Sequence, residues 1–137
     1  MYSVFKSFHS YFAWAVLVLI ILSVLAALLS KGTFKNSYKK IAKYGLISVH
    51  IQLLVGLILY FLSPNGFQNL SGDTMKDSFA RLLAVEHPFI NIVAIILITI
   101  GHSQAKKLED GSKKILIFYG IGLILLLSRI PWSTWLG

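Results

Sequence analysis

The chain has 137 residues, of which 56% are hydrophobic, and it carries a formal net charge of +8 and no cysteine. This apolar fraction exceeds the soluble-protein average of about 45–50%, the mean hydropathy is +0.75, and the length predicts one domain, residues 1–137. The lack of cysteine excludes thiolate metal sites, iron–sulfur clusters, disulfides and thioether-attached haem, so any metal cofactor must be held mainly by histidine.

Four apolar runs follow one another along the chain, at 11–29, 44–62, 82–100 and 115–130. Each approaches the ~17–25 residues that cross a bilayer core, although the last is short unless charged side chains at its ends extend outward. The first run exceeds the ~7–15-residue core of a cleaved signal peptide, so we expect it to remain as a span. The runs predict an all-α, integral membrane four-helix bundle with helices at about 4–30, 41–62, 78–104 and 113–130.

The positive charge is distributed unevenly along the chain. Lysines gather in the first and third connections: Lys31, Lys35, Lys39, Lys40, Lys43, Lys106, Lys107, Lys113 and Lys114. The positive-inside rule places these connections in the cytoplasm and both termini on the outer side. This distribution favours anionic lipid headgroups over nucleic acid as the partner of the basic surface.

The third apolar run carries two histidines, His87 and His102, on a stripe of small and polar residues. They lie fifteen positions apart, a rise of roughly 22 Å with an angular offset of about 60° on one helix. A helix that is apolar on its other faces turns such a stripe toward the interior of a membrane bundle. This spacing would let one helix hold two haems, one near each surface.

His9 in the first run and His50 in the second complete the set of four histidines. One histidine in a membrane helix is often only a hydrogen-bonded contact, but four in or beside apolar runs favour ligation. The estimated depth of each histidine along its apolar run leaves two ways of pairing the histidines open. Either His9 pairs with His87 and His50 with His102, or His50 and His87 share one haem at mid-membrane. The depths scatter the imidazoles too widely for a zinc or copper cluster.

Three charged residues lie at or near the outer ends of the third and fourth runs. Arg81 and Arg129 are candidate contacts for haem propionates, with interfacial anchoring as the structural alternative. Glu86 is a carboxylate inside a membrane helix, where such groups usually have a partner or handle protons. It is expected to accept a hydrogen bond from a ligand imidazole, to serve as a proton acceptor at a quinone pocket, or simply to pair with Arg81 near the headgroups.

Several short motifs resemble a known family. They are Phe8-His9-Ser10-Tyr11 with Trp14, His50-Ile51-Gln52, Glu86-His87-Pro88, Ile100-Gly101-His102-Ser103 and Ile130-Pro131-Trp132. Together they resemble small four-helix membrane proteins of Bacteroidota that are labelled cytochrome b. The resemblance implies a multi-pass protein of the bacterial inner membrane with non-covalent haem b, and it points to His9, His50, His87 and His102; by the positive-inside argument above, the termini would lie in the periplasm. Members of that family have Trp and Arg where this chain has Phe12 and Ala13.

The leading hypothesis is therefore a b-type cytochrome that transfers electrons through one or, as the pairing of four histidines favours, two bis-histidine haems. It would be a subunit beside other membrane or periplasmic redox proteins, and a quinone is a further candidate partner, rather than a stand-alone enzyme. The alternative is a cofactor-free helical accessory or assembly subunit of a larger membrane complex. A proton or metal carrier is a weaker third interpretation, since the chain has no repeated halves.

Overall fold

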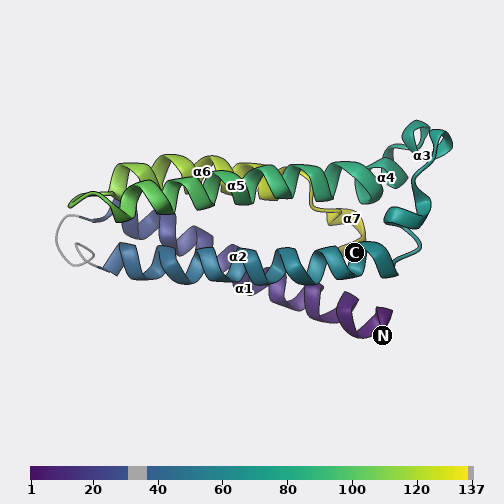
Figure 1. The fold of residues 1–137 in the computed structure, drawn as a ribbon, viewed down its shortest axis with the longest axis horizontal. Helices are drawn as coiled ribbons and strands as arrows, with labels where there is room; N and C mark the ends of the chain where they lie inside the picture. The colour runs from purple at the N-terminus through teal and green to yellow at the C-terminus, as the bar shows by residue number, and fades with distance from the viewer. Residues whose placement is uncertain (31–36, 136–137) are drawn as a thin grey trace.

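The computed structural model describes residues 1–30 and 37–135, and all regular structure in these residues is helical (Figure 1). Four long helices dominate. They are α1 (Tyr2–Leu28), α2 (Ser37–Leu62), α5 (His87–Lys106) and α6 (Ser112–Ser128). The all-α prediction is confirmed. The helix boundaries lie within about one turn of those expected from the apolar runs, except that α5 begins at His87 rather than at the expected residue 78. Lys31 and Lys35 lie outside the described residues.

Three helical segments are long and apolar enough to cross a membrane: Tyr2–Leu28, Ser37–Leu62 and Ser78–Lys106. α6 has 17 residues, which corresponds to roughly 25 Å at ~1.5 Å per residue. Many large apolar side chains on the outward faces are exposed, including Val18 on α1 and Ile124 on α6. Water-exposed helices carry polar residues on such faces, so this pattern indicates contact with lipid.

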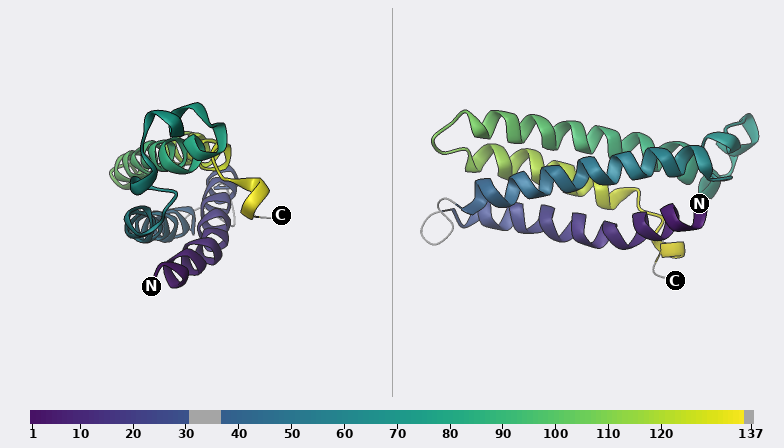
Figure 2. Two further views of the ribbon diagram at one scale, coloured as in Figure 1. Left: turned by 90° about the vertical axis from the view of Figure 1, so that its right-hand side faces the viewer. Right: turned by 60° about the horizontal axis from the view of Figure 1, so that its bottom comes forward.

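The long helices pack in a closed cycle. α1 packs against α2 and α6, while α5 packs against α6 and α2 (Figures 1 and 2). The core between them combines apolar side chains such as Ile20, Ile98 and Tyr119 with small residues such as Ala42 and Ala94. Small residues let helix backbones approach closely where both sides of the interface are apolar.

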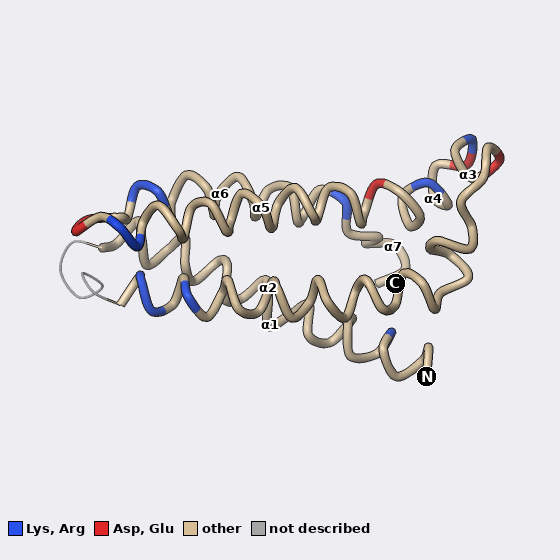
Figure 3. The backbone as a smooth tube through the Cα atoms, in the orientation of Figure 1, with Lys and Arg blue, Asp and Glu red and all other residues tan. Residues whose placement is uncertain are grey.

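The two ends of the molecule differ in charge and in the elements that they carry (Figure 3). The lysines near residue 40 and near residue 110 lie together at the end where α2 and α6 begin. Both termini lie at the opposite end, with the short helices η1 (Phe67–Asn69), α3 (Gly72–Lys76) and α7 (Trp132–Trp135). We refer to these two ends as the lysine end and the terminal end.

The third apolar run is not one continuous α-helix. It begins as α4 (Ser78–Arg81), capped by the Asp77 side chain, which accepts a hydrogen bond from the Phe79 N–H. It widens into a π-helical turn, η2 (Leu82–Glu86), and continues as α5 with Pro88 in its first turn. A proline cannot donate to the preceding turn, and a π-helical turn is one way for a helix to accommodate the missing bond. The disturbance of the helix before Pro88 takes this form.

Candidate functional site

The rings of His9 on α1 and His87 on α5 face each other near the terminal end. Their centres are 6.2 Å apart and their planes are almost perpendicular, at 84°. Two imidazoles that bind one metal ion from opposite sides, each at roughly 2 Å, have ring centres about 6 Å apart. The His9–His87 half of the first arrangement expected from the sequence therefore corresponds to a juxtaposition of side chains from two helices.

His9 is held close to α2 by two residues one turn apart. The Gln52 amide donates a hydrogen bond to the His9 carbonyl oxygen at 2.7 Å. One turn later, a Cβ atom added to Gly56 would lie 3.2 Å from His9 Cε1. Gln52 thus bonds α2 to α1, and Gly56 provides the space that the imidazole ring occupies.

Two buried polar atoms of this region have no hydrogen-bond partner among the described residues: Nδ1 of His9 and Oε1 of Gln52. Buried polar groups in folded proteins are almost always satisfied by protein, water or a ligand. Nδ1 is one of the two nitrogens through which imidazole can bind a metal, and it lies at the edge of the ring beside Gly56, where an added Cβ atom would be 3.6 Å away.

His87 is oriented by the end of α6. Its Nδ1 lies 2.9 Å from the carbonyl oxygen of Arg129, and an Nδ1–H donor there leaves the lone pair on Nε2. This arrangement, with one nitrogen bonded to a backbone carbonyl, is typical of metal-ligating histidines. The Asn91 amide nitrogen lies 3.1 Å from Nδ1 and 3.3 Å from Nε2, and with the proton on Nδ1 only Nε2 can accept a hydrogen bond from it.

The candidate propionate contacts are engaged with a carboxylate of the protein itself. Arg81 Nε lies 2.8 Å from Glu86 Oε2, and Arg129 Nε lies 3.7 Å from Glu86 Oε1. Arg81 also donates to the Met75 carbonyl oxygen. Of the interpretations offered for Glu86, the structure has the pairing with Arg81 and adds Arg129 as a second partner. Both arginines remain candidate contacts for haem propionates, but Glu86 would first have to move away from them.

Sequence reasoning did not single out Tyr60. Its hydroxyl donates a hydrogen bond of 2.8 Å to the carbonyl oxygen of Ala84, inside the π-helical turn that leads to His87. Ala84 lies four residues before Pro88 and in a regular α-helix would accept from residue 88. The four-residue spacing between Ala84 and Pro88 is the one sequence feature that indicates an unbonded carbonyl oxygen at Ala84.

His50 and His102 do not meet. The Thr99 hydroxyl donates to the Ile95 carbonyl oxygen, so it accepts from Nε2–H of His50 at 3.1 Å. His102 instead lines a cavity among lysines at the lysine end. Thr99 is twelve positions from His87, which is roughly 18 Å along a helix, so His50 and His87 do not share a mid-membrane site either. Ligation by His50 or His102 stays a prediction.

Within residues 1–30 and 37–135, no group of three or more His, Asp or Glu side chains gathers closely enough to hold a metal ion. A protein-ligated zinc centre needs three or four such ligands. A haem needs only two from the protein, because the porphyrin supplies the other four. The donor set at His9 and His87 therefore fits a haem iron better than a bare ion.

Comparison of the chain with protein-family models, with curated proteins and with solved structures found no match.

Proposed function

We propose that this protein is a membrane-embedded b-type haem protein in which His9 and His87 ligate one haem iron. The observation that carries the proposal is the facing pair of imidazoles, 6.2 Å apart, with Nδ1 of His9 buried and unpartnered. Bound haem supplies reversible one-electron transfer, and occupation of both axial positions by imidazole favours that over oxygen chemistry.

The residues around the pair have distinct roles in this proposal. The Arg129 carbonyl fixes the His87 ring, and the Gln52 bond holds the α1 backbone at His9. Gly56 leaves space beside the His9 ring. Arg81 and Arg129 place positive charge at the terminal end, where acidic haem substituents would lie. Glu86 between them is the candidate proton acceptor if a quinone is the electron partner.

The proposal includes a membrane arrangement. α6 would act as a fourth, short span alongside the three longer ones. The lysine end would face the cytoplasm, because basic connections stay inside, and both termini would face the periplasm of a bacterial inner membrane. The protein would then exchange electrons with another membrane or periplasmic redox subunit.

A second candidate function is supported by different contacts. His50 bonds to Thr99, and His87 bonds to the Arg129 carbonyl, as polar contacts in a cofactor-free bundle would. In that case the chain is a helical accessory or assembly subunit of a larger membrane complex.

Haem content separates the two functions. The full chain is expressed with haem precursor, purified in detergent, and its haem-to-protein ratio is measured by the pyridine haemochrome assay. We expect a ratio of one, lost in His9→Ala and in His87→Ala and kept in His50→Ala and His102→Ala. A ratio of two, halved by loss of either His50 or His102, would establish the second haem. No bound haem in the parent protein would reject the cytochrome and leave the accessory subunit.

A further inference from the structure

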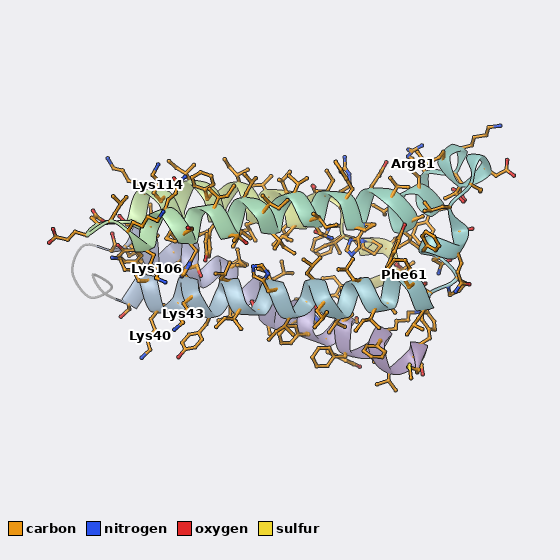
Figure 4. The ribbon with its side chains drawn as sticks, viewed as in Figure 1. Lys40, Lys43, Phe61, Arg81, Lys106 and Lys114 are labelled. Atoms are coloured by element: carbon orange, nitrogen blue, oxygen red, sulfur yellow. The ribbon has the colours of Figure 1, made fainter. Side chains whose placement is uncertain are left out.

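A cavity of about 320 Å³ opens between α2 and α5 at the lysine end. His102 and four lysines line its mouth: Lys39, Lys40, Lys43 and Lys106. Its apolar wall is formed by Ala105 and Ile115, which are both buried. The cavity thus combines a cationic opening with a small apolar interior. Figure 4 shows Lys40, Lys43 and Lys106 together at this end.

Among the described residues, no acidic side chain forms an ion pair with the lysines of this cavity. Both ion pairs in that part of the chain involve Glu86 at the terminal end. Asp110, in the nearby connection, instead accepts hydrogen bonds from the Ser112 hydroxyl and N–H. Like charges gathered without counter-ions repel one another, so an external anion would stabilise this arrangement.

One of the lysines is fixed in place. Lys39 Nζ donates a 2.7 Å hydrogen bond to the carbonyl oxygen of Leu108, which ties the start of α2 to the connection after α5. The bond from Lys39 to Leu108 therefore forms one side of the cavity. Lys40, Lys43 and Lys106 remain exposed.

We infer that this cavity binds the phosphate of an anionic phospholipid headgroup. The cavity lies where membrane-crossing helices end, which is the depth of the headgroups. Basic pockets between membrane helices on the cytoplasmic side recognise such headgroups, because the lysines meet the phosphate while the apolar wall meets the glycerol and acyl region. The inference does not depend on haem and goes beyond the proposed electron transfer.

The test uses the full chain in detergent micelles and counts bound lipid by native mass spectrometry. The probes are phosphatidylglycerol, phosphatidylcholine with the same acyl chains, and inorganic phosphate. We expect retained phosphatidylglycerol and little phosphatidylcholine. The variant Lys43→Gln/Lys106→Gln should weaken retention about fivefold for each lysine, or roughly 25-fold in total. Lys43→Arg/Lys106→Arg should restore it.

The matched control is Lys107→Gln/Lys114→Gln, which removes the same charge from the same end outside the cavity. We expect it to retain phosphatidylglycerol within twofold of the parent. Equal losses in both glutamine variants would show diffuse surface attraction and overturn the site. Equal retention of the two lipids, or displacement of phosphatidylglycerol by millimolar inorganic phosphate, would overturn the lipid assignment. Lys43 and Lys106 are both exposed. Thermal melting verifies that each variant is folded.

Discussion

Tyr60 on α2 donates its hydroxyl hydrogen to the carbonyl oxygen of Ala84 in the π-helical turn before His87. Ala84 is buried, and Pro88 cannot donate to it. The Tyr60 bond therefore satisfies a backbone acceptor that the proline leaves free and links α2 to the segment that positions His87.

We expect Tyr60→Phe to lower the free energy of unfolding by roughly 1 kcal/mol, because a buried carbonyl loses its side-chain donor while ring packing is kept. Unfolding in mixed detergent and sodium dodecyl sulfate measures the difference. Tyr44→Phe is the control, since Tyr44 lies on the same helix with its side chain half exposed. An equal effect of both substitutions would show that the Ala84 bond contributes nothing specific.

The positions of the long helices could be predicted from the sequence, because lipid contact requires long apolar runs that leave a clear pattern. α1 and α6 end within two residues of the predicted 30 and 130. Breaks inside a run are harder to predict. Pro88 indicated a disturbance, but whether the helix kinks or widens into Leu82–Glu86 depends on how neighbouring helices bond to it.

The candidate site was partly predictable for a similar reason. Depth along a helix follows from counting residues, so the juxtaposition of His9 and His87 could be expected from the sequence. Rotation about the helix axis and sideways spacing depend on packing. His50 therefore bonds to Thr99, whereas His102, three residues further along, lies among lysines. The contribution of Tyr60 needed the structure, because Pro88 indicates a free carbonyl oxygen four residues earlier but not which side chain donates to it.

Asp110 makes the stability of the lysine end depend on pH in the acid range. Hydrogen bonds from the Ser112 hydroxyl and N–H hold the pKa of Asp110 below its ordinary value. A carboxyl group with a lower pKa in the folded state stabilises the fold fully above its unfolded pKa, about 3.9, and this contribution is lost as the pH falls through the folded pKa.

We therefore expect the melting temperature of the parent protein to fall more between pH 5 and pH 3 than that of Asp110→Asn, which keeps an acceptor for Ser112 but does not titrate. Glu109→Gln removes the adjacent carboxylate and should keep the parent's pH profile. Identical profiles for the parent and Asp110→Asn would contradict this assignment.

Glu86 forms ion pairs with two arginines, Arg81 before it in the sequence and Arg129 after it. In Glu86→Gln, Arg81 and Arg129 lose their shared carboxylate, and we expect a loss of about 1 kcal/mol at low salt. The loss should shrink at high salt, because about two-thirds of the Glu86 side chain is buried and the rest is open to screening. Unfolding in mixed micelles at two salt concentrations measures both effects. Asp73→Asn on α3 removes an acid at the same end and should have little effect at either salt concentration.

The close approach of α5 and α6 depends on glycine at two positions. A Cβ atom on Gly101 would collide with Phe118, and one on Gly122 would lie 2.7 Å from Ile98 Cγ1. We expect Gly101→Ala and Gly122→Ala each to lower stability by about 1–3 kcal/mol, since the helices must separate to admit the methyl group. This cost should exceed the gain of about 0.8–1.0 kcal/mol that alanine brings to a helix interior.

Gly120→Ala is the matched control, because an added Cβ there meets nothing within 4 Å. It lies on the same helix as Gly122 and receives the same change in helix propensity without the collision. We expect its stability to be unchanged or higher by up to about 1 kcal/mol in the same unfolding assay. If Gly122→Ala behaved like Gly120→Ala, the contact between α5 and α6 would have to be looser than the structure has it. The opposite signs expected for two substitutions two residues apart therefore test the packing of these helices directly.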